Sequence, residues 1–196
     1  MLKRIFDFLF SAIALLLLAP FFLVIAVAIK LKSKGPVFYK QTRVGQNSVD
    51  FKIYKFRTMY TGSDRHGLIT VGGRDSRITP VGFFLRKYKL DELPQFLNVI
   101  RGDMSLVGPR PEVRKYVELY TDEQLEVLSV KPGITDYASI DYSNENELLG
   151  NASDPDKEYI HNIMPAKLAL NLKYIREKNF VVDMKIMWRT IAKIVT

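Results

Sequence analysis

The chain has 196 residues, 47% of them hydrophobic, and a formal net charge of +8. This size and apolar content fit one folded domain with an appendage and exclude a disordered chain. Cysteine is absent and the two histidines, His66 and His161, are far apart in the sequence, so disulfides and thiolate zinc sites are excluded and any metal should bind carboxylate oxygens. The basic excess predicts a polyanionic partner: nucleic acid, anionic lipid or a phosphorylated substrate.

Residues 8–29 form an apolar run whose only polar side chain is Ser11. The run exceeds the about 20 residues that a helix needs to cross a bilayer, and the about 7–15 residues usual in a signal peptide. Two membrane interpretations stay open: a spanning helix, and a re-entrant helix bent at Ala19-Pro20, because proline removes a backbone donor. Basic residues flank both ends and leave the orientation undecided: Lys3, Arg4, Lys30, Lys32 and Lys34.

Aromatic and branched residues at 37–40 and 51–56, joined by a connection with Gly45, predict a β-hairpin. At the end of its second strand, spacing alone places Lys55 and Arg57 on the surface, with a phosphate contact as the alternative. Glycine-rich residues 61–76 are expected to form a loop, but neither standard phosphate-loop motif is present. A short helix is expected over 81–89.

The segment 90–95 reads Leu-Asp-Glu-Leu-Pro-Gln and places two carboxylates, Asp91 and Glu92, side by side. Pro94 and the apolar residues after it predict that the acids lie in the first turn of a helix, where the helix dipole favours an ionised Asp91. Carboxylates among cations indicate either a structural ion network or an active site for a phosphate. The surrounding cations are Arg74, Arg77, Arg86, Lys87, Lys89, Arg101 and Arg110.

Pro109 and Pro111 frame Arg110 in a turn rich in glycine and proline, a rigid way to hold a guanidinium against a phosphate. Pro111 is expected to start a helix that runs to Glu118, and residues 131–135 are expected to form a second turn. Helices are also predicted over 166–178 and 181–195. The last is amphipathic and basic, so it either packs as a terminal helix or lies on the membrane interface through Trp188.

Several motifs at fixed spacing make the chain resemble the bacterial sugar transferases, the small monotopic phosphoglycosyl transferases. The resemblance covers nearly the whole chain. Its motifs are Lys55-Phe56-Arg57-Thr58-Met59, Arg77-Ile78-Thr79, Val81-Gly82, Leu85-Arg86, Leu90-Asp91-Glu92-Leu93-Pro94-Gln95, Asn98-Val99, Gly102-Asp103-Met104-Ser105, Val107-Gly108-Pro109-Arg110-Pro111, Lys131-Pro132-Gly133-Ile134-Thr135 and Asp183.

The resemblance implies transfer of a phosphosugar from a UDP-sugar to polyprenol phosphate, with undecaprenyl the bacterial default, on the cytoplasmic face of the bacterial inner membrane. It implies that Asp91 is the nucleophile and a ligand of Mg²⁺, that an aspartyl-phosphosugar forms as UMP leaves, and that Glu92 assists. The implied phosphate-binding residues are Lys55, Arg57, Arg86, Pro109, Arg110 and Pro111. Cations near Asp91 would cancel the repulsion between a carboxylate and a diphosphate.

The sequence departs from the family pattern at three places. The family bends its membrane helix at a Ser-Pro pair, where this chain has Ala19-Pro20. Many relatives have glycine after the threonine of the 131–135 motif and arginine near position 143, where this chain has Asp136 and Ser143. These two positions indicate a different sugar pocket or phosphate contact.

We therefore expect an α+β fold: a mostly helical membrane-associated domain with a small β-hairpin and an N-terminal hydrophobic helix, re-entrant or spanning, bent at Pro20. Residues 1–34 would be the membrane-inserted helix and residues 35–196 the cytoplasmic catalytic domain with interfacial helices. Membrane lipids are expected partners, nucleic acid is not, and the terminal helix permits a homodimer. The alternatives are a basic membrane-anchored adaptor without catalysis and a metal-dependent phosphohydrolase.

Overall fold

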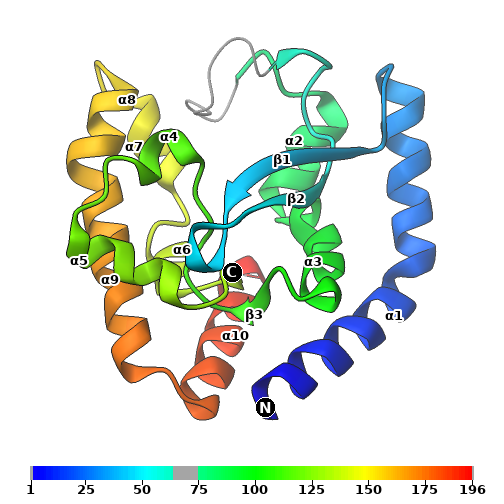
Figure 1. The fold of residues 1–196 in the computed structure, drawn as a ribbon. Helices are drawn as coiled ribbons and strands as arrows, with labels where there is room; N and C mark the ends of the chain where they lie inside the picture. The colour runs from blue at the N-terminus through cyan, green and yellow to red at the C-terminus, as the bar shows by residue number, and fades with distance from the viewer. Residues whose placement is uncertain (1, 64–74, 196) are drawn as a thin grey trace.

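The computed structural model describes residues 2–63 and 75–195, so most of the predicted glycine-rich loop lies outside the described residues. The described chain is α+β, as expected: helices surround two small sheets, and a long helix flanks them (Figure 1). The elements are α1 Leu2–Lys32, β1 Phe38–Val44, β2 Asp50–Phe56, α2 Pro80–Lys87, the 3-10 helix η3 Leu90–Gln95, α3 Phe96–Arg101, β3 Ser105–Val107, α4 Arg114–Val117, α5 Asp122–Leu125, β4 Gly133–Thr135, α6 Tyr137–Asp141, α7 Glu145–Gly150, α8 Pro155–Glu158, α9 Met164–Glu177 and α10 Phe180–Val195.

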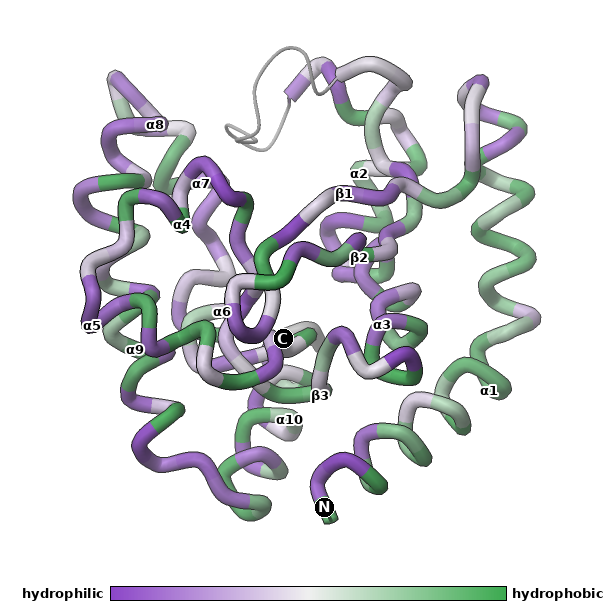
Figure 2. Tube along the Cα trace, in the orientation of Figure 1, coloured by the Kyte–Doolittle hydropathy of each residue, from purple (hydrophilic) through white to green (hydrophobic). Residues whose placement is uncertain are grey.

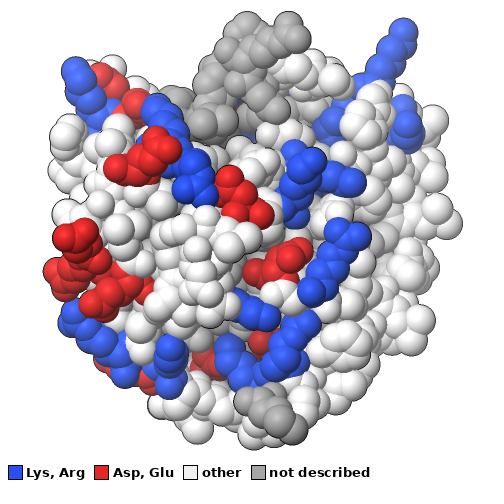
Figure 3. Space-filling view, viewed as in Figure 1, with Lys and Arg blue, Asp and Glu red and all other residues white. Residues whose placement is uncertain are grey.

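Helix α1 is long and apolar enough to cross a membrane, and Pro20 lies inside it. Figure 1 shows that the helix bends partway along its length and that both of its halves run beside the rest of the chain. Its apolar residues extend over most of its length in Figure 2, and the edge of the molecule along α1 is largely uncharged in Figure 3. A proline within a helix removes one backbone hydrogen bond, which is a physical reason for the bend.

The N-terminal end of α1 is attached to the rest of the chain by polar contacts. Lys3 Nζ lies 2.5 Å from Asp183 Oδ2 in α10, and Ser105 Oγ donates to Asp7 Oδ2 at 2.7 Å. Arg4 donates to the last carbonyls of α3, where a cation also suits the negative end of the helix dipole. The basic residues before the apolar run are therefore engaged by the domain.

The C-terminal end of α1 packs on the same domain. Ile25 and Ile29 are buried in a cluster with Phe56 of β2 and Leu85 of α2. Just beyond the helix, Arg57 donates to the carbonyls of residues 33 and 36. Both ends of the apolar helix thus contact one domain.

The predicted hairpin is confirmed, with a first strand that continues to Val44. Strands β1 and β2 pair antiparallel, from Phe38 opposite Phe56 to Val44 opposite Asp50. The paired residues Tyr39 and Lys55 share one face. Because side chains alternate along a strand, Lys55 points to the same side of the hairpin as Ile53, which is buried in the core.

The second expected turn, residues 131–135, is instead partly a strand. Strand β4 pairs parallel with β3, with Ser105 opposite Gly133 and Val107 opposite Thr135. The backbones approach so closely that a Cβ on Gly133 would lie 2.1 Å from the nitrogen of Gly108. Short strands of this kind depend on a partner distant in sequence, which local pattern does not reveal.

The helix expected from Pro111 begins later, at Arg114. Residue 113 is extended, and the carbonyl of Glu112 accepts a hydrogen bond from the nitrogen of Val44 at 2.9 Å. The segment after Pro111 is therefore held as an extension of the hairpin before the chain turns into α4.

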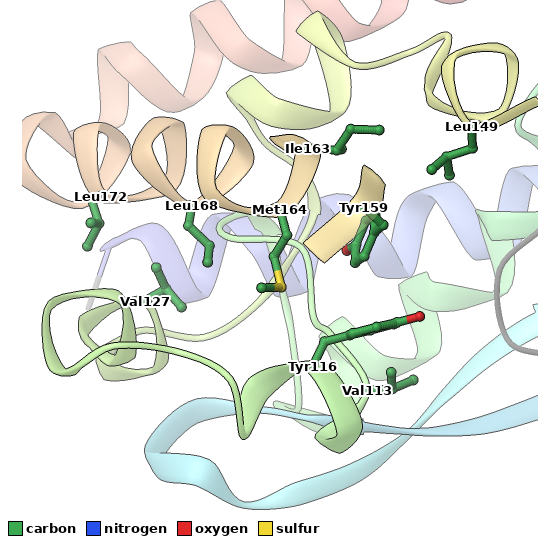
Figure 4. Close-up of a cluster of buried hydrophobic side chains, with 9 residues drawn as sticks. All are labelled: Val113, Tyr116, Val127, Leu149, Tyr159, Ile163, Met164, Leu168 and Leu172. Carbon is green, nitrogen blue, oxygen red and sulfur yellow. The ribbon is translucent and has the colours of Figure 1, made fainter. Parts of the chain in front are cut away.

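Helices α2, α9 and α10 confirm the helices predicted over 81–89, 166–178 and 181–195 to within a few residues. The largest hydrophobic cluster joins α9 to the segments around α4, α5, α7 and α8 (Figure 4). Its members are Val113, Tyr116, Val127, Leu149, Tyr159, Ile163, Met164, Leu168 and Leu172. Helix α10 buries Ile186 completely and leaves Trp188 74% exposed, so one face packs and the other remains open.

Candidate active site

The two acids lie in the first turn of η3, so the prediction that they open a helical segment is confirmed. Lys89, with φ 55°, turns the chain sharply from α2 into η3, and Pro94 lies inside the 3-10 helix. The following helix is fixed to the hairpin by the fully buried Asn98, which accepts from the nitrogen of Tyr54 at 3.0 Å and donates to the carbonyl of Lys52 at 2.8 Å. The hairpin therefore positions the acid pair.

Glu92 is held between two cations. Lys55 Nζ donates to Glu92 Oε1 at 2.8 Å, and Arg110 binds both carboxylate oxygens through its two terminal nitrogens. Burial of Glu92 opposes its ionisation, but Arg110 and Lys55 outweigh this effect and hold its pKa well below the usual value. Glu92 is thus a fixed negative charge at the centre of the site.

Asp91 lies in a different environment although it is the next residue. It is 7% exposed, and no hydrogen bond to its carboxylate is found among the described residues. Burial and the neighbouring charge of Glu92 raise its pKa, against the opposing effects of Lys55, Arg86 and Lys89. The net direction is opposite to the one expected from the helix dipole alone, because a short 3-10 turn compensates little of the lost hydration.

Arg86 approaches the acids from α2. Its Nε donates to Thr58 Oγ1 at 2.9 Å, and Asp91 is the leading charge that opposes the lowering of its pKa by burial. Helix α2 is placed by its N-cap, Thr79, which accepts from the nitrogen of Gly82 at 2.9 Å. A Cβ on Gly82 would lie 1.9 Å from the carbonyl oxygen of Thr58, so only glycine permits this close packing.

Arg110 is presented by a turn that several segments hold. The carbonyl of Pro109 accepts from the nitrogen of Gly133 at 3.0 Å, and the carbonyl of Pro111 accepts from Arg43 Nη1 at 3.1 Å. The two prolines therefore shape and anchor the turn through their backbone. Glu92 raises the pKa of Arg110, so its guanidinium remains charged.

The described hydrogen bonds of Arg57 are made to the segment that follows α1 and not to the acid pair. It is 5% exposed and donates to the carbonyls of Pro36 at 2.6 Å and Ser33 at 2.9 Å. The structure thus brings together Asp91, Glu92, Lys55, Arg86 and Arg110, whereas the described contacts of Arg57 join the hairpin to the end of α1.

Sequence reasoning assigned no positioning role to three residues that shape the site. Asn98 and Arg43 act through backbone groups of distant segments, and no local pattern signals such contacts. Asp136, which the sequence marked only as a departure from a family pattern, is completely buried, and its carboxylate contacts backbone nitrogens, including that of Arg110. Position 136 is therefore structural in its observed contacts.

The acid pair offers limited capacity for a metal by itself. Among residues 2–63 and 75–195, no group of three or more histidine or acidic residues is arranged to hold an ion. Mg²⁺ commonly uses one or two carboxylates and completes its shell with water and substrate phosphates. Asp91, which has no competing hydrogen bond among these residues, fits the role of the single protein ligand, whereas Glu92 is engaged by its two cations.

A bent apolar helix docked on a domain, with a buried acid pair among cations beside it, defines a membrane-associated protein with a site suited to phosphorylated substrates. The chain belongs to the bacterial sugar transferase family, because the family model matches residues 1–196.

Relatives of known name agree with this assignment. The chain is 40% identical to a UDP-N-acetylgalactosamine-undecaprenyl-phosphate N-acetylgalactosaminephosphotransferase of Aeromonas hydrophila, covering 100% of this chain and 44% of the relative. It is 38% identical to a UDP-glucose:undecaprenyl-phosphate glucose-1-phosphate transferase of Escherichia coli (strain K12), covering 98% and 40%. It is 40% identical to the exopolysaccharide production protein PSS of Rhizobium leguminosarum bv. phaseoli, covering 100% and 96%. The chain thus spans less than half the length of the first two relatives.

Proposed function

We propose that the chain is a phosphoglycosyl transferase that moves a phosphosugar from a UDP-sugar to polyprenol phosphate, with undecaprenyl phosphate as the acceptor named in its relatives. The observation that carries the proposal is the contrast within the acid pair. Asp91 is buried, has a raised pKa and accepts no hydrogen bond from the described residues, whereas Glu92 is bound by Lys55 and Arg110. A carboxylate with free lone pairs among cations suits attack on phosphorus.

In the first step, a carboxylate oxygen of Asp91 attacks the phosphorus that bears the sugar. The bond from that phosphorus to the bridging oxygen breaks, and UMP leaves with the electron pair. An acyl phosphosugar on Asp91 remains. Because the donor is anionic, the step requires positive charge nearby, and Lys55, Arg86 and Arg110 are the candidates to supply it.

In the second step, a phosphate oxygen of the lipid attacks the same phosphorus. The bond between that phosphorus and the Asp91 oxygen breaks, which regenerates the carboxylate and gives a polyprenyl diphosphosugar. A covalent intermediate lets one site serve a soluble donor and a membrane-bound acceptor in turn.

Glu92 orients the cations in this proposal. Its lowered pKa keeps it ionised at neutral pH, which makes it a poor proton acceptor and a good partner for Lys55 and Arg110. Arg110 donates two of its five N–H groups to Glu92, so further donors remain for a phosphate.

Mg²⁺ is part of the proposal, with Asp91 as its protein ligand. When bound, the ion would neutralise charge on the diphosphate and make the phosphorus more electrophilic. The chain's own contribution is to bury Asp91 without a hydrogen bond from the described residues, and to hold Lys55 and Arg110 beside Glu92.

We also propose that α1 enters the membrane and returns to the side from which it entered. This topology places the site at the cytoplasmic face of the inner membrane. The contacts of both helix ends with one domain support this topology, because a straight spanning helix would separate its ends by the bilayer thickness, about 30 Å. Pro20 inside the helix supports the bend.

The test is nucleotide release from a panel of UDP-sugars with Mg²⁺, with and without polyprenol phosphate. We expect UMP, with the lipid required for turnover. UDP would mean ordinary glycosyl transfer and would remove the role of Asp91. Free sugar phosphate without lipid product would identify a phosphohydrolase instead. No release from any donor would contradict the enzymatic proposal.

A further inference from the structure

Asp136 is a fully buried carboxylate that bridges two segments of the chain. Its Oδ2 accepts from the backbone nitrogen of Arg110 at 3.1 Å, and its Oδ1 accepts from the backbone nitrogen of Ser139 at 2.6 Å. Its exposed fraction is 0%, and it makes no salt bridge within the described chain. A completely buried carboxyl loses its hydration, and the two backbone nitrogens supply hydrogen bonds in place of water.

Asp136 lies beside the turn that carries Arg110. The residue directly follows β4, whose pairing with β3 supports the turn that carries Arg110: the nitrogen of Gly108 donates to the carbonyl of Thr135 at 3.1 Å. The last free amide of that turn, at Arg110, is then bound by the Asp136 side chain. Asp136 also contributes its negative charge to the raised pKa of Arg110.

We propose that Asp136 is a positioning residue for Arg110: it fixes the backbone of residue 110 against β4 and α6, so that the guanidinium is presented to the donor diphosphate at a set distance from Asp91. The inference rests on the proposed function for the identity of the ligand. Asp136 accepts a hydrogen bond from the backbone nitrogen of Arg110, and Glu92 accepts hydrogen bonds from the guanidinium of the same residue. Arg110 is thereby constrained at both its backbone and its side chain.

A competing explanation is that Asp136 serves only as the N-cap of α6. Asp136→Asn separates the two roles. Asparagine caps helices about as well as aspartate, so the bond from Ser139 is kept. Its amide has only one oxygen, however, so the group facing the nitrogen of Arg110 becomes an NH₂ donor, and two donors then oppose each other. Asp136→Ser is a second variant, because serine caps but is too short to serve both amides.

Asp154→Asn is the matched control. Asp154 caps α8 through the nitrogen of Lys157 at 3.2 Å, its side chain is 46% exposed, and its described partner is Lys157, to which it also forms an ion pair. The control therefore removes the same charge from the same kind of cap and leaves the turn of Arg110 intact.

The first measurement is hydrogen exchange of a peptide that contains Arg110. We expect faster exchange there in D136N and D136S and no change in D154N, with exchange in α6 preserved in D136N. The second is steady-state turnover, in which we expect D136N to lose about tenfold in kcat/KM for the UDP-sugar with a raised donor KM, since an unsatisfied amide costs about that much. D154N should stay within about twofold of the unmodified chain.

The outcomes distinguish this inference from the proposed function. Unchanged exchange at Arg110 in D136N would overturn the positioning role whether or not the enzyme is active. Faster exchange with an unchanged donor KM would also overturn it, because the position of Arg110 would then not matter to the donor. Absence of UMP from the unmodified chain would contradict the proposed function alone, and the exchange result would still decide whether Asp136 fixes the turn.

Discussion

Asp91 and Glu92 are neighbours in the sequence, yet their carboxylates lie in opposite electrostatic environments. The pKa of Asp91 is raised, first by burial and then by Glu92, whereas the pKa of Glu92 is lowered by Arg110 and Lys55 despite its own burial. Adjacent residues in a 3-10 turn point in different directions, so one can enter an ion cluster that the other does not. This difference makes separate predictions for the two acids.

Asp91→Asn should abolish turnover and stabilise the fold. A carboxyl whose pKa is raised in the folded state contributes stability below its unfolded pKa and loses it as the pH rises, so ionised Asp91 is unfavourable at neutral pH. Asparagine removes the charge at equal size, and we expect a Tm higher by about 2–4 °C, the shift for roughly 1 kcal/mol in a chain of this size. Thermal denaturation and UMP release at pH 7 check both parts. Full turnover in this variant would refute the role of Asp91 as the nucleophile.

Glu92→Gln should have the opposite effect on stability. The substitution leaves Lys55 and Arg110 without their partner, at a cost of about 3 kcal/mol, the low end for a broken buried pair because Arg110 is 33% exposed. The pKa of Glu92 is lowered, so its stabilisation is present above its unfolded pKa of about 4.3 and is lost as the pH falls through the folded value. The Tm difference between E92Q and the unmodified chain should therefore shrink in acid. A difference that is independent of pH would contradict the ion cluster.

The pH profile of activity should reflect the raised pKa of Asp91. An acid limb of kcat/KM is expected above the ordinary aspartate value of about 3.9, because only the ionised carboxylate attacks phosphorus. Raising the Mg²⁺ concentration should move the limb to lower pH, since a cation favours the ionised form, and chelation should abolish turnover. The limb belongs to the coupled acid pair. A limb at or below the ordinary value would contradict the structure.

Among the elements, α1 decides the topology, and the contacts of its two ends make that topology testable. Leu2 and Lys34 are exposed and lie at opposite ends of the apolar helix, and the sequence has no cysteine to create background. Single cysteines at these two positions should both react with a membrane-impermeant thiol reagent in inverted inner-membrane vesicles and be protected in right-side-out vesicles, because both ends would lie on the cytoplasmic face. Reaction of the two cysteines from opposite sides would establish a spanning helix.

The pair of short strands β3 and β4 should tolerate no side chain at their closest approach. A Cβ added to Gly133 would meet the nitrogen of Gly108 at 2.1 Å, and backbone atoms cannot swing away as side chains do. Gly133→Ala should therefore displace the turn of Arg110 and lower kcat/KM by about tenfold or more, the equivalent of about 1.4 kcal/mol. Gly150→Ala, exposed at the end of α7, is the control. Equal activity of both variants would show that the pairing of β3 with β4 does not position the turn of Arg110.

At the scale of the whole molecule, α1 is part of the core as well as a membrane segment. Ile25 and Ile29 complete the cluster around Phe56 and Leu85, and each buried isoleucine contributes about 1.5–3 kcal/mol. Residues 35–196 alone should therefore aggregate or melt well below the full chain, although the sequence predicts a division at residue 34. Circular dichroism and size-exclusion chromatography of the two chains check this. A monomeric truncated chain with the same Tm would show that the division is real.

The sequence by itself determined the apolar helix, the hairpin and the acid pair, because each depends on a pattern within a few residues: a long apolar run, alternating aromatic residues and a proline in a first helical turn. It also determined most of the cation set, since Arg86 and Arg110 lie near the acids in the chain. For Lys55, spacing alone favoured the surface and left a phosphate contact as the alternative, and the pairing of β1 with β2 is what brings it to Glu92.

Only the tertiary structure decided that Lys55 and Arg110 bind Glu92 while no described residue donates a hydrogen bond to the carboxylate of Asp91. It also decided that Arg57 contacts the end of α1 and that residues 133–135 form a strand. Each of these depends on partners far apart in the chain: Lys55 lies 37 residues before Glu92, and Asp136 lies 26 residues after Arg110. The environment of a carboxylate is set by the charges and the water that folding leaves around it, and these are properties of the packed chain rather than of the local sequence.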